Sequence, residues 1–194
     1  MSNSADGYVL AHDLGTTGDK AVLYSLDGRR VAADEYGYDT RYPRSGYAEQ
    51  DPEEWWAAVC VSTKRLIQKA QIPPSAIRAV SFSAQMMGCL PVNEKGNPLR
   101  PAIIWADMRS EKEARILENS VGMNRVYEIT GHRISSSYSA TKLRWVREHE
   151  PNIYARTYKT LQAKDFVVQR LTGAFVTDYS DACGTNLFDI EGRR

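Results

Sequence analysis

The chain has 194 residues, with 42% apolar and 25% charged side chains, the composition of a globular protein with one substantial core. Its 25 basic and 24 acidic side chains leave a formal net charge of +1, so neither a nucleic acid nor a membrane is an expected partner. Three widely spaced cysteines disfavour a disulfide framework or zinc site and favour a cytoplasmic location. The first six residues lack a basic stretch followed by an apolar one, so no signal peptide is expected, and no apolar run could span a bilayer.

The first part of the chain predicts an antiparallel meander. Three apolar runs have the length of strands: residues 8–12, 21–24 and 30–36. Asp27 and Gly28 separate the second run from the third and predict a hairpin with a type I′ turn, which needs positive φ at both central positions. The turn-forming and charged residues of 41–50 predict a loop.

A long helix and then a mostly helical second half are expected after residue 50. Asp51 can cap the first helix, and Pro52 fits its first turn, while Pro73 and Pro74 end it. Further strands are expected over residues 77–83, 89–92 and 101–105, with a short one at 174–177. Further helices are expected over residues 109–119, 121–129, 139–149 and 163–171. Strands followed by helices predict an α/β architecture.

The strongest local signal is a glycine- and threonine-rich stretch between the first two strands: Asp13, Leu14, Gly15, Thr16, Thr17, Gly18, Asp19 and Lys20. Small residues at such a turn let backbone N–H groups approach phosphate oxygens. The hydroxyls add donors, Lys20 adds charge, and Asp13 can hold a hydrated magnesium ion. The alternative is an ordinary glycine-rich hairpin turn. No P-loop or Rossmann motif is present, which excludes those two routes to phosphate binding.

A second group of polar and aromatic residues follows two later strands. Trp105, Asp107 and Arg109 would place an aromatic face, an acceptor and a fork of donors at one strand end, which is chemistry that binds sugars. The alternative is a core tryptophan beside a surface ion pair. Gln85, Met86 and Met87 follow another strand, where methionines are usually core residues.

Other polar residues are assigned to structure rather than chemistry. His12 lies in an apolar strand and is expected to be a hydrogen-bonded core histidine. Asp19 is expected to point away from Lys20, toward solvent, because neighbouring residues of a strand face opposite sides. Asp165 is expected to cap a helix, and Lys142 and Trp145 are expected to pack and orient theirs.

Taken together, these stretches resemble the FGGY carbohydrate kinase family, which includes xylulokinase and glycerol kinase. The first motif is similar to the phosphate motif of the whole actin-like ATPase superfamily. The choice within that superfamily depends on three further segments, found in the family's order: residues 85–88, 101–109 and 139–146. Residues 177–188 also resemble that family. The resemblance covers the chain from about residue 8. It implies an incomplete ribonuclease-H-like α/β domain, with a mixed sheet flanked by helices.

The resemblance also implies an activity, the transfer of the ATP γ-phosphoryl group to a sugar hydroxyl with Mg²⁺. It assigns phosphate binding to Gly15, Thr16, Thr17, Gly18 and Lys20, with Asp13 holding the metal ion through water. It assigns sugar binding to Gln85, Met86, Met87, Trp105, Asp107 and Arg109. Glycerol kinases carry Arg-Glu where this chain has Met86 and Met87, which speaks against glycerol. Xylulokinase-like members match better, although they usually carry His at Met87, so a ketopentose such as xylulose is the expected sugar and its exact identity stays open.

In this family the catalytic base is an aspartate in a Gly-Asp motif downstream of the last motif found here. Residues 1–194 would therefore be the N-terminal, sugar- and phosphate-binding domain, without its C-terminal part and the second domain. The missing remainder is an expected partner, and the chain alone is expected to be inactive and able to pair with a second copy through uncovered apolar surface. Two alternatives stay open: an actin-like or chaperone-type ATPase, and a non-catalytic sugar-binding module.

Overall fold

The computed structural model describes residues 7–194; the expectation about a signal peptide concerns residues 1–6 and lies outside them. The described residues form two compact units, one of residues 7–39 and 53–84 and the other of residues 40–52 and 85–194. Within residues 7–194, no helix combines the length and the apolar character needed to cross a bilayer.

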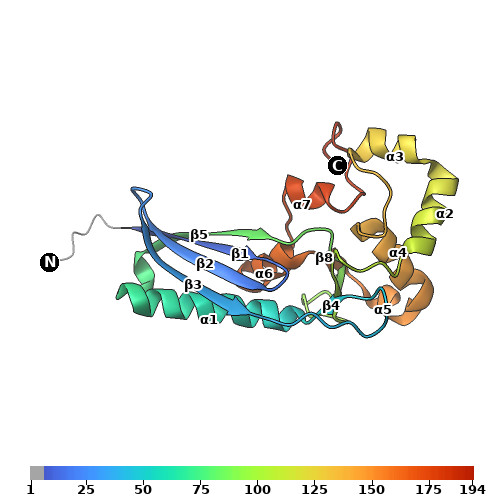
Figure 1. The fold of residues 1–194 in the computed structure, drawn as a ribbon. Helices are drawn as coiled ribbons and strands as arrows, with labels where there is room; N and C mark the ends of the chain where they lie inside the picture. The colour runs from blue at the N-terminus through green and yellow to red at the C-terminus, as the bar shows by residue number, and fades with distance from the viewer. Residues whose placement is uncertain (1–6) are drawn as a thin grey trace. The chain divides into compact units, whose positions relative to one another are not determined.

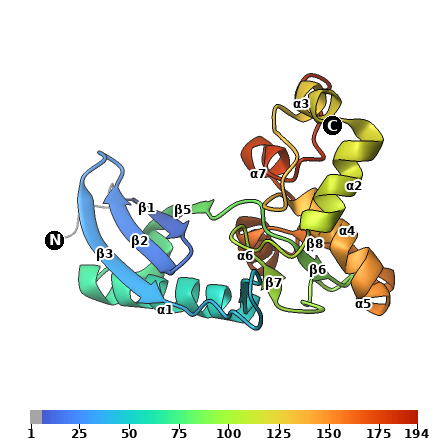
Figure 2. The ribbon, with the colours of Figure 1, turned by 45° about the vertical axis from the view of Figure 1, so that its right-hand side comes forward.

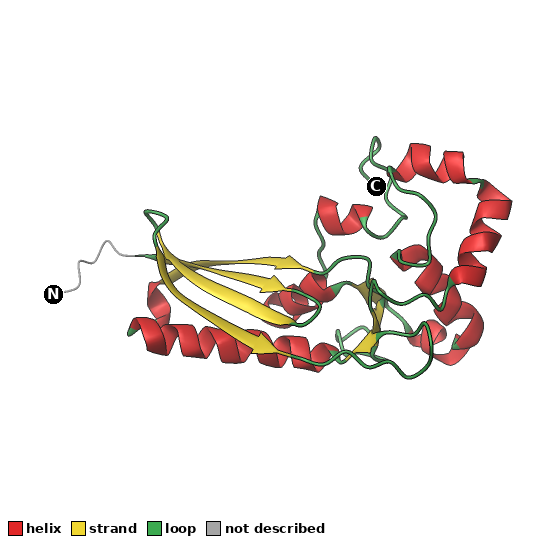
Figure 3. Ribbon diagram, viewed as in Figure 1, coloured by secondary structure: helices red, strands yellow, loops and turns green. Residues whose placement is uncertain are grey.

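The first unit is built on a four-stranded mixed sheet (Figures 1 and 3). Its strands are β1 (Tyr8–Leu14), β2 (Gly18–Ser25), β3 (Arg30–Gly37) and β5 (Ile77–Ala84), in the spatial order β3-β2-β1-β5. The first three pair antiparallel as the predicted meander, and β5 joins β1 in parallel. The predicted mixed sheet is confirmed.

One face of this sheet is covered by the helix α1 (Pro52–Ala70), which lies along the strands in Figures 1 and 2. Leu10, Ala21 and Leu23 point from the sheet into a core that Leu66 of α1 completes. Alternate residues of β1 and β2 are buried against α1, which leaves the other half of their side chains on the opposite face. A short 3₁₀ helix, η1 (Pro74–Ala76), leads into β5.

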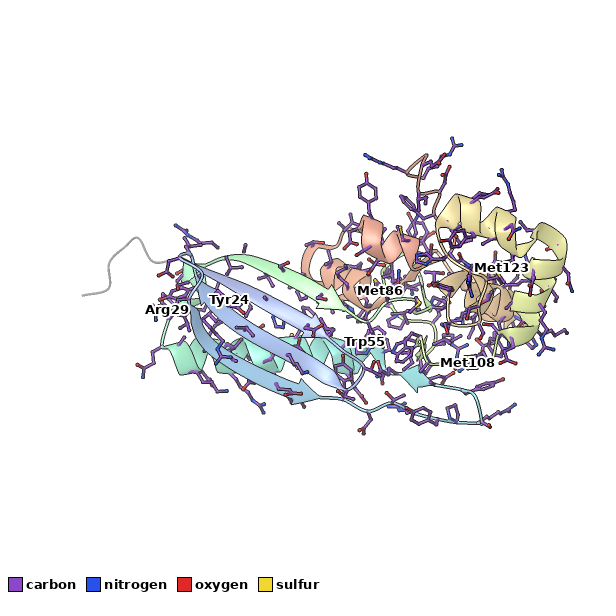
Figure 4. The ribbon with its side chains drawn as sticks, turned by 45° about the horizontal axis from the view of Figure 1, so that its top comes forward. Tyr24, Arg29, Trp55, Met86, Met108 and Met123 are labelled. Carbon is purple, nitrogen blue, oxygen red and sulfur yellow. The ribbon has the colours of Figure 1, made fainter. Side chains whose placement is uncertain are left out.

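The turn between β2 and β3 differs from the predicted type I′ turn. Gly28 has a φ of +83°, but Asp27 is not among the residues with positive φ. Gly28 N donates to Ser25 O at 2.9 Å, and Ser25 N donates to Arg29 O at 3.0 Å. The hairpin is therefore closed by a turn in which only Gly28 adopts the left-handed conformation. Tyr24 and Arg29, labelled in Figure 4, lie on either side of this turn.

The second unit is mostly helical (Figure 3). Its helices are α2 (Glu111–Val121), α3 (Met123–Thr130), α4 (Ser139–His149), α5 (Pro151–Arg156), α6 (Ala163–Thr172) and α7 (Tyr179–Cys183). Its strands are short and form two pairs, β4 (Glu49–Gln50) with β7 (Ala102–Ile103) and β6 (Leu90–Val92) with β8 (Lys159–Leu161). A cluster of Cys89, Ile103, Trp145 and Val146 forms a core between these strands and α4.

Three parts of the second unit differ from the sequence-based expectation. Residues 174–177 form no strand, and β4 lies inside the expected loop of residues 41–50. The elements α5, β8 and α7 were not predicted. They have only six, three and five residues, too few to show a hydrophobic period.

Candidate functional site

The predicted phosphate turn joins two adjacent antiparallel strands in the first unit. Asp13 of β1 is paired with Lys20 of β2, so the two side chains lie next to each other on one face of the sheet. Both residues are exposed, on the face opposite α1. They line a hollow of about 430 Å³ together with Ser81 and Ser83 of β5. A carboxylate, an ammonium group and two serines therefore meet at one place on the sheet.

The turn itself is held by its own backbone and by the start of the segment after β3. Gly15 N donates to Gly18 O at 2.9 Å, so this N–H group is already used inside the turn. A Cβ atom at Gly18 would lie 2.6 Å from Tyr36 O, so only glycine fits there. Tyr38 donates its hydroxyl to Gly15 O at 2.5 Å and its N–H group to Thr17 O at 3.2 Å. Burial, followed by the charges of Asp19 and Asp13, raises the pKa of Tyr38, which keeps this hydroxyl a donor.

Asp19, inside the motif, does not point to solvent as expected. Its side chain is fully buried on the α1 side of the sheet, where Asp19 Oδ2 lies 2.9 Å from His12 Nδ1 and accepts from Ser62 Oγ at 2.5 Å. His12 Nε2 lies 3.2 Å from Thr63 Oγ1. The prediction that His12 is a bonded core histidine is confirmed. The alternation of side chains along a strand predicts that Asp19 and Lys20 lie on opposite faces of the sheet. It does not predict which of the two faces a helix covers, and this is where the expectation for Asp19 was wrong.

The sugar-site residues predicted from the sequence lie in the second unit, on two segments that run side by side. Cys89 and Ile103 exchange backbone hydrogen bonds of 2.9 and 3.0 Å, which brings residues 85–88 next to the chain that follows β7. Met86, labelled in Figure 4, is 38% exposed and Trp105 is 42% exposed. The indole ring of Trp105 and the thioether of Met86 are thus accessible at the surface of the second unit.

Gln85 carries a buried acceptor that has no donor. Its Nε2 atom donates to Gln50 Oε1 at 2.6 Å, and Gln50 Nε2 donates in turn to Thr40 Oγ1 at 2.8 Å. Gln85 Oε1 is buried and has no hydrogen-bond partner within the described residues. A buried amide oxygen without a donor is uncommon in folded proteins and fits a position that a bound water or ligand hydroxyl completes.

Asp107 is surrounded by donors from the protein itself. Its side chain is fully buried, and Oδ2 accepts from Ala48 N at 2.6 Å and from Arg109 Nη2 at 2.7 Å. Oδ1 accepts from Arg109 N and Arg109 Nε, both at 2.9 Å. Both oxygens are therefore occupied, and direct contact of Asp107 with a sugar stays a prediction that this geometry does not favour.

Arg109 is equally enclosed. Its side chain is 1% exposed and makes a second ion pair of 2.8 Å with Glu49. Its guanidinium carbon lies 4.0 Å from the ring centroid of Tyr47 and 4.9 Å from that of Trp145. Arg109 thus ties β4, the segment after β7 and α4 together, and its contact with a sugar also stays a prediction.

The backbone of Met87 and Gly88 is held by side chains that the sequence analysis did not assign to the site. Lys142 and Ser139 of α4 donate to the carbonyl oxygens of Met87 and Gly88, at 2.9 and 2.6 Å. Gln162, the residue before α6, accepts from Met87 N at 2.6 Å. Lys142 had a signal in the sequence, a lysine on the apolar side of its helix, whereas Gln162 had none.

Metal binding in this chain would depend on few protein ligands. Within residues 7–194, no three or more His, Cys, Asp or Glu side chains are grouped to hold a metal ion. Mg²⁺ at nucleotide sites is usually bound by one or two carboxylates, water and the substrate phosphates. The exposed carboxylate of Asp13, one strand away from Lys20, fits that requirement.

Comparison with known proteins places the chain in a family. Residues 8–194 match the FGGY family of carbohydrate kinases, N-terminal domain. A xylulose kinase of Staphylococcus xylosus is 35% identical over 95% of the chain, and a gluconokinase of Bacillus subtilis is 34% identical, also over 95%. A solved structure described as a xyloylose kinase from Brucella ovis is 35% identical, with a TM-score of 0.91 over 96% of the chain.

The chain therefore belongs to the FGGY family of carbohydrate kinases and corresponds to the N-terminal portion of its members. The predicted α/β fold with a mixed sheet and flanking helices is confirmed. The chain spans 38% of the S. xylosus relative, 36% of the B. subtilis relative and 39% of the B. ovis structure.

Proposed function

We propose that this chain is the N-terminal, sugar- and phosphate-binding domain of a cytoplasmic kinase that transfers the γ-phosphoryl group of ATP to a hydroxyl of a ketopentose such as xylulose. The observation that carries the proposal is the family match over residues 8–194, together with the exposed Asp13 and Lys20 at the turn that carries the phosphate motif. Relatives described as gluconokinase and glycerol kinase match at similar identity, so the choice of sugar rests on residues 85–87.

On the phosphate side, the β1–β2 turn presents Thr17 and Lys20 to solvent. The ammonium group of Lys20 would neutralise charge on the transferring phosphoryl group, and Thr16 and Thr17 would donate to phosphate oxygens beside Gly15 and Gly18. Asp13 would hold Mg²⁺ through water, and the bound ion would screen the phosphate charges. The exposed face of the sheet around Asp13 leaves room for this arrangement.

On the sugar side, Trp105 would stack on the apolar face of the sugar, and Gln85 Oε1 would accept from one of its hydroxyl groups. Met86 and Met87 would form an apolar wall in place of the charged pair expected for glycerol. Asp107 and Arg109 would contribute mainly by fixing the segment that carries Trp105, because their polar atoms bond to Ala48, Glu49 and each other.

The remaining machinery lies outside this chain in the proposal. The catalytic base and most of the adenine site would belong to the C-terminal part of the domain and to the second domain. Their absence would leave apolar surface through which the isolated chain pairs with a second copy.

A substrate panel tests the proposal. The complete gene product, which carries this chain, is assayed for ADP formation with D-xylulose, other ketopentoses, glycerol and gluconate. We expect the largest kcat/KM with a ketopentose and a loss of about 10-fold or more for glycerol. Preference for glycerol or gluconate would contradict the choice of sugar, and ATP hydrolysis that no sugar stimulates would contradict the kinase itself.

A further inference from the structure

The segment that precedes β6 contains a bend in an unusual backbone conformation. Met87 has a φ of +64°, and it is one of four non-glycine residues with positive φ in the described part of the chain. A non-glycine residue in that region is strained, and the conformation persists only where the surroundings hold it. The contacts of Met87 should therefore show what imposes the bend.

Side chains from α4 and from the start of α6 make those contacts. Lys142 Nζ donates to Met87 O at 2.9 Å, and Gln162 Oε1 accepts from Met87 N at 2.6 Å. Ser139 Oγ donates to Gly88 O at 2.6 Å. Both backbone polar groups of Met87 and the next carbonyl are thus bonded by side chains rather than by a neighbouring strand.

Lys142 is the least expected of these partners. It is fully buried, and its second hydrogen bond goes to Ser137 O, just before α4. Burial lowers its pKa to about 8, which reflects the cost of keeping an amine away from water. A methionine or leucine at this position would pack against the core without that cost.

We propose that Lys142, supported by Gln162 and Ser139, is a positioning residue of the sugar site that holds the Met87 bend, so that Gln85 and Met86 face the sugar. This inference rests on the proposed sugar kinase function. Lys142 itself does not touch the sugar, because its amine is enclosed by the carbonyl groups of Met87 and Ser137.

Replacing the amine while keeping the length of the side chain separates positioning from packing. In the complete gene product, Lys142→Met should raise the KM for the sugar by about 10-fold or more, since small misplacements of binding groups are costly. The KM for ATP should stay unchanged, because the hydrogen bonds of Lys142 go to Met87 O and Ser137 O and not to the predicted phosphate turn. Lys69→Met is the matched control, because Lys69 of α1 also donates to a backbone carbonyl, Ala33 O at 3.1 Å, but holds no residue of the sugar site.

A readout independent of activity is amide hydrogen exchange in the 194-residue chain. Lys142→Met should speed exchange at the Met87 amide, which donates to Gln162 Oε1, by about 10-fold or more, because a hydrogen bond that keeps the bend closed is lost. Exchange in the β1–β2 hairpin should stay unchanged. Ser139→Ala, which removes only the bond to Gly88 O, should give a smaller effect in the same direction and serves if Lys142→Met does not fold.

Two results would overturn the inference. One is local exchange that stays at the wild-type rate; the other is a fall in apparent kcat in proportion to lost folded protein, with both KM values unchanged. Failure of the wild-type protein to phosphorylate any sugar would instead contradict the proposed function. The exchange comparison would still decide whether Lys142 holds the bend.

Discussion

Asp107 illustrates how a residue of a sugar-binding stretch can be committed to the protein itself. Asp107 and Arg109 form a buried pair that also binds Ala48 N and Glu49, so the pair connects β4 to the chain after β7. Removing one member of a buried pair leaves the other charge without full compensation. The stability of the second unit should therefore be sensitive to this carboxylate.

We predict that Asp107→Asn lowers the free energy of unfolding by about 3 kcal/mol, the lower end of the range for breaking a buried pair, because Glu49 still faces Arg109. Urea unfolding of the 194-residue chain measures this loss, with the exposed Asp27→Asn as control. If stability is unchanged and Asp107→Ala in the complete gene product raises only the sugar KM, Asp107 contacts the sugar directly, as the sequence first suggested.

Tyr38 is the side chain that fixes the phosphate turn. Its hydroxyl donates to Gly15 O at 2.5 Å, and loss of one such bond costs about 0.5–1.5 kcal/mol. We predict that Tyr38→Phe weakens binding of Mg·ADP by about 2- to 10-fold through a looser turn. Calorimetric titration of the complete gene product measures the change, and Tyr42→Phe, at a position 69% exposed, is the control. An unchanged affinity for Mg·ADP would mean that the turn does not need this bond or does not bind the nucleotide.

At the scale of elements, α6 and α7 meet through a group of charges. Lys164 of α6 forms ion pairs with Asp178, the N-cap of α7, and at 3.4 Å with Asp181 inside α7. Asp181 is fully buried, and burial raises its pKa to about 6 despite Lys164, with the nearby carboxylates of Asp165 and Asp178 adding to the rise. Burial also acts on Asp178, but its bonds from Lys164 and Ser180 lower its pKa below the usual value.

These opposite shifts separate two pH windows. Because the pKa of Asp181 is higher in the folded state than the ordinary 3.8, the folded chain binds the proton more tightly. The stabilising contribution of Asp181 to the free energy of unfolding is therefore greatest below pH 4 and is lost as the pH rises to about 6. The pKa of Asp178 is lowered in the folded state, so its contribution is present above its ordinary pKa and is lost only as the pH falls below that value.

We predict that Asp181→Asn removes a decline in unfolding free energy of about 1–3 kcal/mol between pH 4 and 6. Asp178→Asn should lessen the decline in that window without removing it, because the Asp178 carboxylate is only one contributor to the raised pKa of Asp181. Urea unfolding at several pH values measures both. An equal slope in wild type and Asp181→Asn would show that Asp181 does not titrate there.

The elements that the sequence predicted well were long enough to show a repeating apolar pattern or had a clear boundary residue. Such patterns are found in β1, β2, β3, β5 and α1, because one face of the sheet packs against one side of the helix. The turn at Gly28 was predicted as a hairpin but not as its type, because Asp27-Gly28 suits more than one turn geometry.

The candidate site was less predictable, since its residues depend on distant partners. Asp19 was correctly expected to point away from Lys20 but was expected in solvent, because nothing local to β2 indicates that His12 and Ser62 lie on that face. Lys142 was expected only to pack and orient its helix, because its bond to Met87 O joins positions 55 residues apart.

At the scale of the whole molecule, the proposed function divides a kinase between this chain and a longer remainder. The chain holds the predicted phosphate turn and the predicted sugar residues, and it spans 36–39% of the relatives described above. In the proposal, the catalytic base and most of the adenine site belong to that remainder. Loss of a positioned base typically removes about 10²–10⁴-fold in rate, and loss of nucleotide orientation removes more.

The most direct measurement compares ADP formation by the 194-residue chain and by the complete gene product, with the preferred sugar of the panel, Mg²⁺ and ATP. We predict turnover of about 1–100 s⁻¹ for the complete protein and none above background for the chain alone. Turnover by the chain alone at a kinase rate would contradict the account, because an aspartate such as Asp13, Asp107 or Asp165 would then have to serve as the base.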